Sequence, residues 1–213
     1  MPEAQEEPLN VYDVEGRAVG VMPRAAAKRS GLAVGAVNIL LINAAGEVLL
    51  QRRPADKENG GLWDKSVGGH VGAGEDFDRA AVREAGEELF DDPTSPRVVL
   101  AAGEEAFLAR LPATDLARDV LFRRVSFQRN LRDVRQGPEG GLRNVLYHVA
   151  VYLGRTEVPL ARFRPQESEI AELRYFPPAA VDEMLGRGQL APNMAFLWLT
   201  HAHALLSGGA ALQ

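Results

Sequence analysis

Three glutamates in one short segment have a spacing that suits metal chemistry. Glu84, Glu87 and Glu88 stand three and four residues apart, so a helix would place their carboxylates on one side. Like charges at this spacing repel one another, and a divalent cation removes that repulsion. Carboxylate oxygens suit Mg²⁺ and Mn²⁺. Taken alone, this spacing more often marks a solvated acidic helix face, and a metal site is the alternative.

The residues before and around these glutamates predict a loop followed by a helix. Gly68–Gly74 holds four glycines in seven residues, which permits the backbone turns of a tight loop. From Phe77 to Leu89 apolar residues recur every four positions, the pattern of an amphipathic helix. Asp76 can cap the first turn of that helix.

The whole segment resembles the signature of the Nudix hydrolases. A glycine, a glutamate, an Arg-Glu pair and a Glu-Glu pair stand at the intervals of that signature. The matching residues are Gly69, Glu75, Arg83, Glu84, Ala85, Glu87 and Glu88. Phe90 stands where the signature has glycine, and Asp91 stands where it has an apolar residue. Both departures concern the turn at the end of the helix and leave the carboxylates in register.

The resemblance implies a magnesium-dependent hydrolase, with manganese as an option. Such enzymes cleave a diphosphate linked to another moiety, with water attacking a phosphorus atom. The implied metal ligands are Glu84, Glu87, Glu88 and the carbonyl group of Gly68. Glu84 could instead be the general base, because members of the family differ in which carboxylate has that role.

The resemblance also suggests roles for residues that surround the metal ligands. Arg83 would orient the glutamates and Glu75 would pair with Arg83, more as a structural salt bridge than as a direct catalyst. Many members of the family add a carboxylate from outside the signature. Glu169 is the candidate here, Glu167 is its alternative, and an ordinary exposed loop position is the simpler interpretation of each.

Four residues are candidates for substrate binding. Arg52 and Arg53 could bind phosphate through their planar guanidinium groups, although neighbours on a strand alternate and one should face solvent. Trp63 could stack on a base, with burial as the more common fate of tryptophan. His70 is assigned a structural or phosphate-binding role. We expect a nucleoside diphosphate, nucleoside triphosphate or nucleotide sugar as substrate, selected by residues 56–63, 128–142 and 162–169.

A narrower resemblance points to the Nudix proteins that are close to isopentenyl diphosphate isomerase. It covers roughly residues 9–92 and continues more weakly to about residue 200. The isomerase requires a catalytic cysteine directly before its Gly-His pair, where this chain has Gly68, and the chain contains no cysteine. A proton shuttle needs its acid–base group, so isomerisation is not expected. A catalytically inactive Nudix module that binds a nucleotide or a protein is a further alternative.

Composition limits the classes of protein that remain. The 213 residues carry a formal net charge of −5, which argues against a general nucleic-acid binder. The absence of cysteine excludes disulfides, thiolate metal sites and thiol nucleophiles. No signal peptide or run long enough to span a membrane is found, so a cytoplasmic protein is expected. Its partner would be a small-molecule diphosphate, and the family resemblance allows a homodimer.

The order of elements predicts an α+β protein. Residues 1–8 should form a disordered tail, and residues 9–213 a single Nudix domain with an N-terminal hairpin and a C-terminal helix. The resemblance implies the Nudix fold, an α/β/α sandwich with a mixed β-sheet between helices. We further expect a turn-rich loop at residues 133–141. In the final helix, expected at Met194–Leu206, His201 would be a polar position near the helix end.

Overall fold

The computed structural model describes residues 7–136, 142–166 and 168–210. The expected disordered tail therefore lies mostly outside the described residues. Pro8, however, is the first residue of a strand. The hairpin expected at residues 9–21 therefore begins one residue earlier than predicted.

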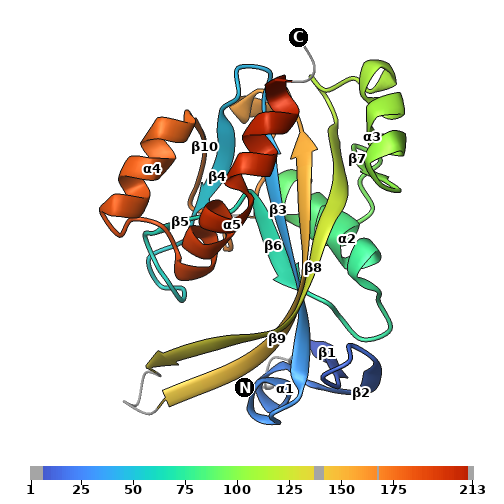
Figure 1. Cartoon of the computed structure of the whole chain (residues 1–213), viewed down its shortest axis with the longest axis vertical. Helices are drawn as coiled ribbons and strands as arrows, with labels where there is room; N and C mark the ends of the chain where they lie inside the picture. The colour runs from blue at the N-terminus through green and yellow to red at the C-terminus, as the bar shows by residue number, and fades with distance from the viewer. Residues whose placement is uncertain (1–6, 137–141, 167, 211–213) are drawn as a thin grey trace.

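A mixed β-sheet forms the centre of the molecule (Figure 1). Its strands are β1 (Pro8–Tyr12), β2 (Ala18–Pro23), β3 (Ala33–Ile42), β4 (Val48–Arg52), β5 (Trp63–Asp64), β6 (Val67–His70), β7 (Val98–Ala101), β8 (Val120–Gln136), β9 (Leu142–Arg155) and β10 (Glu172–Phe176). The main path runs β10-β4-β3-β9-β8-β7, and β6 pairs with β3. β3 is parallel to β9 and β7 is parallel to β8. The remaining pairs are antiparallel.

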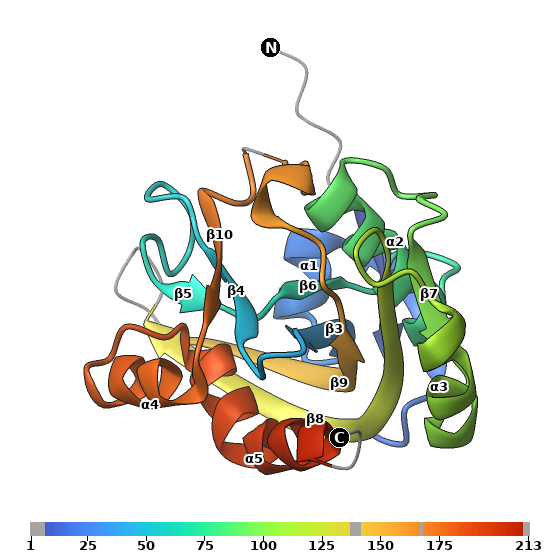
Figure 2. The same cartoon turned by 90° about the horizontal axis from the view of Figure 1, so that it is seen from above.

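Helices cover both faces of this sheet, as Figure 2 shows from above. They are α1 (Arg24–Arg29), α2 (Phe77–Phe90), α3 (Glu104–Arg110), α4 (Pro178–Gly186) and α5 (Pro192–Ala210), with short 3-10 turns at Leu111–Ala113 and Leu160–Arg162. α2 lies on one side of the sheet, and α4 and α5 lie on the other. None of the described helices combines the length and the apolar character needed to cross a membrane.

Alternation along β3 divides the core into two layers. Ile39 and Leu41 belong to the buried cluster that contains Leu89 of α2. Leu40, between them, belongs to the cluster that contains Met194 of α5. Because successive side chains of a strand point to opposite faces, this central strand is apolar on both sides. The expected α/β/α sandwich with a mixed sheet is confirmed.

The hairpin of β8 and β9 is longer than the sequence predicted. The turn-rich loop expected at residues 133–141 is wrong over its first four residues, which remain in β8, and residues 137–141 lie outside the described part. Polar residues near the hairpin end suggested a loop, but cross-strand pairing continues to Gln136 and Leu142. The register of β8 shifts twice, and Asn130, at the second shift, has φ of 58°. Figure 1 shows the far end of the hairpin bending away from the sheet body.

The two departures from the Nudix signature are accommodated at the end of α2. Phe90 completes the helix and is buried, with its ring 5.8 Å from that of Phe163. Asp91 adopts the left-handed conformation, with φ of 53° and ψ of 33°, and its N–H donates to the carbonyl of Glu87. This conformation is one that Asn and Asp tolerate better than most residues. The helix therefore ends at the signature glycine position, and Asp91 follows it as the C-cap.

Candidate functional site

The start of α2 and the strand before it fix the acidic residues in place. The carboxylate of Asp76 accepts a hydrogen bond from the N–H of Arg79 at 2.8 Å, which caps the helix as expected. Farther along the helix, the carboxylate of Glu84 lies directly against the α-carbon of Gly69 in β6. A Cβ atom at residue 69 would overlap that carboxylate, so glycine is required for this approach.

Arg83 connects the acidic residues of the signature. Its Nε and Nη2 donate to the two carboxylate oxygens of Glu75 at 2.8 and 3.0 Å, a bidentate pair. Its Nη1 donates to Glu84 at 3.0 Å and to Glu87 at 2.9 Å. Nη2 also donates to the carbonyl of His70 at 3.0 Å. The expected pairing of Arg83 with Glu75 and with the signature glutamates is present in the structure.

Glu88 lies deeper, where α2 meets the sheet. Its Oε2 accepts from the side-chain amide of Gln51 at 3.2 Å and from the N–H of Gly68 at 3.1 Å. Burial raises the pKa of Glu88 to about 8, and the nearby charge of Glu84 adds to this rise. Burial also raises the pKa of Glu84 to about 7, although Arg83 opposes the change. Two desolvated carboxylates thus lie close together, an arrangement that a cation would stabilise.

The donor set suits a hard divalent cation. The Oε1 atom of Gln51 is buried beside Glu88 and has no hydrogen-bond partner among the described residues. Within those residues Glu88 forms no ion pair, whereas Glu84 and Glu87 are both bonded to Arg83. Among the described residues, no three histidine or acidic side chains are grouped so that they could together hold a metal ion. Glu84 and Glu88 are the pair around which an ion could be held, with waters completing the shell.

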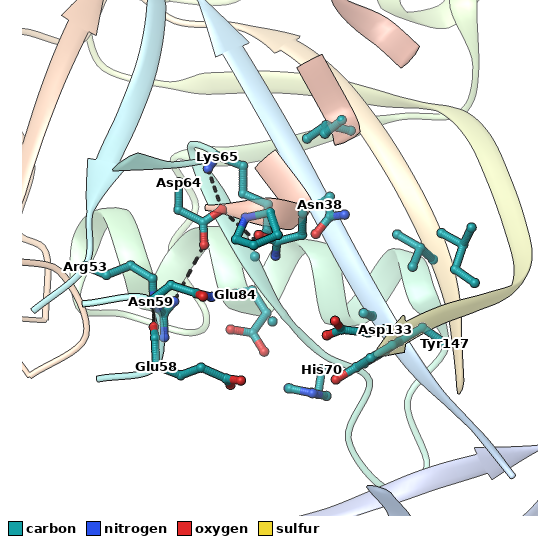
Figure 3. A pocket seen from close by; sticks show the side chains of 18 of the residues that line it. Asn38, Arg53, Glu58, Asn59, Asp64, Lys65, His70, Glu84, Asp133 and Tyr147 are labelled. Atoms are coloured by element: carbon teal, nitrogen blue, oxygen red, sulfur yellow. Dashed lines mark hydrogen bonds and ion pairs between the residues drawn. The ribbon is translucent and has the colours of Figure 1, made fainter. Parts of the chain in front are cut away.

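A cavity of about 760 Å³ opens beside these carboxylates. Residues from all three segments expected to select the substrate contribute to its walls. They include Glu58 and Asn59, then Gln128, Leu131, Arg132, Asp133 and Val134, then Gln166 and Glu169. Figure 3 shows Asp64 between two of the lining cations. It lies 3.7 Å from Nη1 of Arg53 and 3.2 Å from Nζ of Lys65.

The four substrate-binding candidates separate into two pairs. Arg53 and His70 line the cavity, whereas Arg52 and Trp63 do not. Arg52 is exposed and donates to the carbonyl of Gly61 at 3.1 Å, as strand alternation predicts for one of the two arginines. Trp63, whose base-stacking role stays a prediction, lies outside the cavity wall. It packs edge-to-face on Phe176 at 4.7 Å and contacts the core layer of α4 and α5.

His70 is half-buried in a positively charged part of the cavity. Its Nε2 has no hydrogen-bond partner among the described residues. Burial holds the pKa of His70 well below its usual value, and the charges of Lys28 and Arg24 act in the same direction. His70 is therefore neutral at neutral pH.

Glu169 also lines the cavity, where it accepts from Nζ of Lys57 at 2.7 Å, and Glu167 lies outside the described residues.

Sequence reasoning missed three cations that line the cavity: Arg24, Lys28 and Lys65. Arg24 and Lys28 come from α1, more than fifty residues before the signature glutamates. Their spacing of four residues, which places them on one face of a helix, was the available signal. Lys65 is buried beside Gly68, and a Cβ atom at residue 68 would overlap its side chain.

Comparison with known proteins identifies the family. The model of the NUDIX domain matches residues 33–195, and the chain belongs to this family. An uncharacterised Nudix hydrolase of Pseudomonas aeruginosa is 44% identical over 78 residues, which are 36% of this chain and 46% of that protein. An isopentenyl-diphosphate Delta-isomerase of Nocardia farcinica is 42% identical over 84 residues, 38% and 48% of the two chains. The matched segments thus span about half the length of these relatives.

Solved structures share the fold at low sequence identity. A crystal structure of a Deinococcus radiodurans protein has a TM-score of 0.59 at 21% identity, covering 90% of this chain and 96% of that chain. The NUDIX domain of Shewanella oneidensis NrtR, complexed with ADP ribose, has a TM-score of 0.50 at 15% identity, covering 81% and 88%. These similarities establish the Nudix fold.

Proposed function

We propose that the chain is a Mg²⁺-dependent hydrolase of a diphosphate linked to another moiety, with Mn²⁺ as an alternative ion. The observation that carries the proposal is the pair of desolvated carboxylates, Glu84 and Glu88, at the wall of a large cavity. Nucleoside di- and triphosphates and nucleotide sugars are the favoured substrates. ADP-ribose joins the candidates because the related NrtR domain was crystallised with it.

The roles of the residues follow from their positions. Glu84 and Glu88 would hold the ion, and Glu87 and the carbonyl of Gly68 are further candidate ligands. The ion would supply charge neutralisation at the phosphates and a more acidic water. Arg83 positions Glu84 and Glu87 through Nη1, and Glu75 fixes the orientation of the Arg83 guanidinium. Glu84 is also a candidate general base.

Basic residues on the other walls would bind the phosphates. Arg53 lines the cavity next to Asp64, and Arg24 and Lys28 line it from α1. A guanidinium group can pair with phosphate through two N–H groups at once, and lysine contributes a compact charge. A diphosphate between the acidic and basic walls would lie next to the ion held by the glutamates. Positioning and charge neutralisation are the main requirements of phosphoryl transfer.

Isomerase activity is not proposed, although several curated relatives are named isopentenyl-diphosphate Delta-isomerase. Gly68 stands at the position of the isomerase cysteine, and the chain has no cysteine. The space into which a side chain at residue 68 would project is filled by the side chain of Lys65. A side chain at this position would therefore require the flexible end of Lys65 to move.

The test is hydrolysis of a substrate panel with Mg²⁺, comparing the wild type with Glu88→Gln. The panel holds nucleoside di- and triphosphates, nucleotide sugars and ADP-ribose, and the nucleoside monophosphate that forms is measured by chromatography. We expect Glu88→Gln to lower kcat by about 100-fold or more, since several kcal/mol of charge stabilisation depend on the ion. Glu105→Gln, at an exposed helix position, is the control.

Two results would contradict the proposal. Activity that survives Glu88→Gln would remove the carboxylate pair from the mechanism. Absence of wild-type activity on every member of the panel would favour a catalytically inactive module that binds a nucleotide or a protein.

A further inference from the structure

A second hollow lies apart from the carboxylate cavity and is lined entirely by arginines. Its volume is about 360 Å³, and its lining residues are Arg97, Arg118, Arg162 and Arg164. None of the four lines the carboxylate cavity. They come from the segment before β7, the segment before β8, and the end of the 3-10 turn after β9 together with the residues that follow it. The fold therefore brings together four cations from three distant parts of the sequence.

Arg97 is the half-buried member of this group. Its Nε donates to the main-chain carbonyl of Arg118 at 2.7 Å, and its guanidinium lies 4.0 Å from the ring centre of Phe90. Stacking on an aromatic ring and one hydrogen bond hold the plane of the guanidinium in a fixed orientation. A guanidinium carries five N–H donors, so donors remain for a ligand.

Main-chain carbonyls also hold two of the exposed arginines. Nη1 of Arg164 donates to the carbonyls of Ala161 and Phe163, both at 2.8 Å. Nη1 of Arg162 donates weakly to the carbonyl of Ala117 at 3.5 Å. These neutral acceptors orient the side chains without neutralising their charges. The positive charge of the cluster is therefore retained.

The cluster lacks the acidic partners found elsewhere on the molecule. Among the described residues no carboxylate forms an ion pair with any of the four arginines, whereas Arg53, Arg83 and Arg174 all have such pairs. The protein as a whole has a net charge of −5. Burial lowers the pKa of Arg97, the other three arginines add to that effect, and Asp119 opposes it. Asp119 compensates part of the repulsion among the arginines, and a bound anion would relieve the rest.

We propose that Arg97, Arg118, Arg162 and Arg164 form a second binding site, which takes a diphosphate group without a metal ion. Arginine is suited to this ligand because its planar fork matches two phosphate oxygens. Four positive charges match the multiple charge of a diphosphate better than that of a single phosphate. The diphosphate could be free inorganic pyrophosphate or part of a nucleotide, since both offer the same group to the site.

The test is isothermal titration calorimetry of the full chain with inorganic pyrophosphate or ADP, in EDTA at low salt. EDTA removes divalent ions, so the measurement is independent of the proposed hydrolysis. The variant is Arg118→Gln combined with Arg162→Gln, both at exposed positions. The control, Arg17→Gln with Arg187→Gln, removes the same charge from two arginines that have acidic neighbours.

We expect the wild type and the control to bind equally and the Arg118→Gln, Arg162→Gln variant to bind about tenfold or more weakly, since charged hydrogen bonds are lost. Arg118→Lys with Arg162→Lys, which keeps the charge, should recover part of the affinity. Tighter binding of ADP than of pyrophosphate would assign the site to nucleotides, and the reverse would assign it to free pyrophosphate. Absence of wild-type binding, or equal binding by the glutamine variant and the control, would overturn the proposal.

Discussion

At the scale of single residues, the acidic site depends on glycine as much as on glutamate. The Glu84 carboxylate can reach the strand only because Gly69 has no side chain. This contact places the carboxylate of Glu84 against β6, beside the cavity. A signature glycine is thus explained by packing against a functional group, in addition to the freedom that it gives the loop.

Gly69→Ala should lower kcat by about 100-fold, because a carboxylate displaced by about 1 Å no longer positions its partners. Gly186→Ala is the matched control, since an added Cβ there meets no atom within 4 Å. Steady-state formation of the nucleoside monophosphate with Mg²⁺ measures both variants, and thermal unfolding shows that each is folded. An unchanged kcat in folded Gly69→Ala would show that the position of Glu84 is not critical.

At the scale of elements, the sequence predicted what depends on local patterns. The four-residue apolar period and the cap at Asp76 predicted α2. The far end of the β8–β9 hairpin was missed because its stability comes from cross-strand pairing, which local composition does not encode. The position of Arg24 at the cavity likewise depends on contacts between residues that are far apart in the sequence.

His201 lies in a different environment from the one that the sequence predicted. It was expected near a helix end, but α5 continues to Ala210 and His201 is buried within it. Its Nε2 lies 2.9 Å from Oγ of Ser126 in β8. Burial lowers the pKa of His201, so the unfolded chain binds a proton more readily than the folded chain. The stability that this residue contributes is therefore present above about pH 6.5 and is lost as the pH falls through the lowered value.

The melting temperature should consequently fall more steeply with acidification in the wild type than in His201→Gln. Between about pH 7.5 and about pH 5.5 we expect the two decreases to differ by about 2 °C. The half-buried His70 is common to both proteins, so the comparison isolates His201. Circular dichroism at the two pH values provides the measurement, and parallel decreases would contradict the assignment.

At the scale of the whole molecule, the segment before the family match completes the cavity. The NUDIX model begins at residue 33, yet α1 lies before that point. Leu9, Val11 and Ala27 form a buried cluster with Val34 of β3, which attaches β1, β2 and α1 to the sheet. The attached segment adds basic residues to a cavity whose opposite wall is acidic, so substrate binding and catalysis would be divided between the two parts.

Combined Arg24→Gln and Lys28→Gln should therefore weaken substrate binding and spare the chemical step. We expect KM to rise by about tenfold and kcat to change by less than about threefold. The two side chains would bind the substrate and the transition state equally, and the glutamates remain in place. Arg29→Gln is the control, since Arg29 is exposed on the same helix and does not line the cavity. Kinetics on the best substrate of the panel separate the two parameters. A fall in kcat at constant KM would place α1 in the chemical step, and unchanged kinetics would show that the basic wall does not contact the substrate.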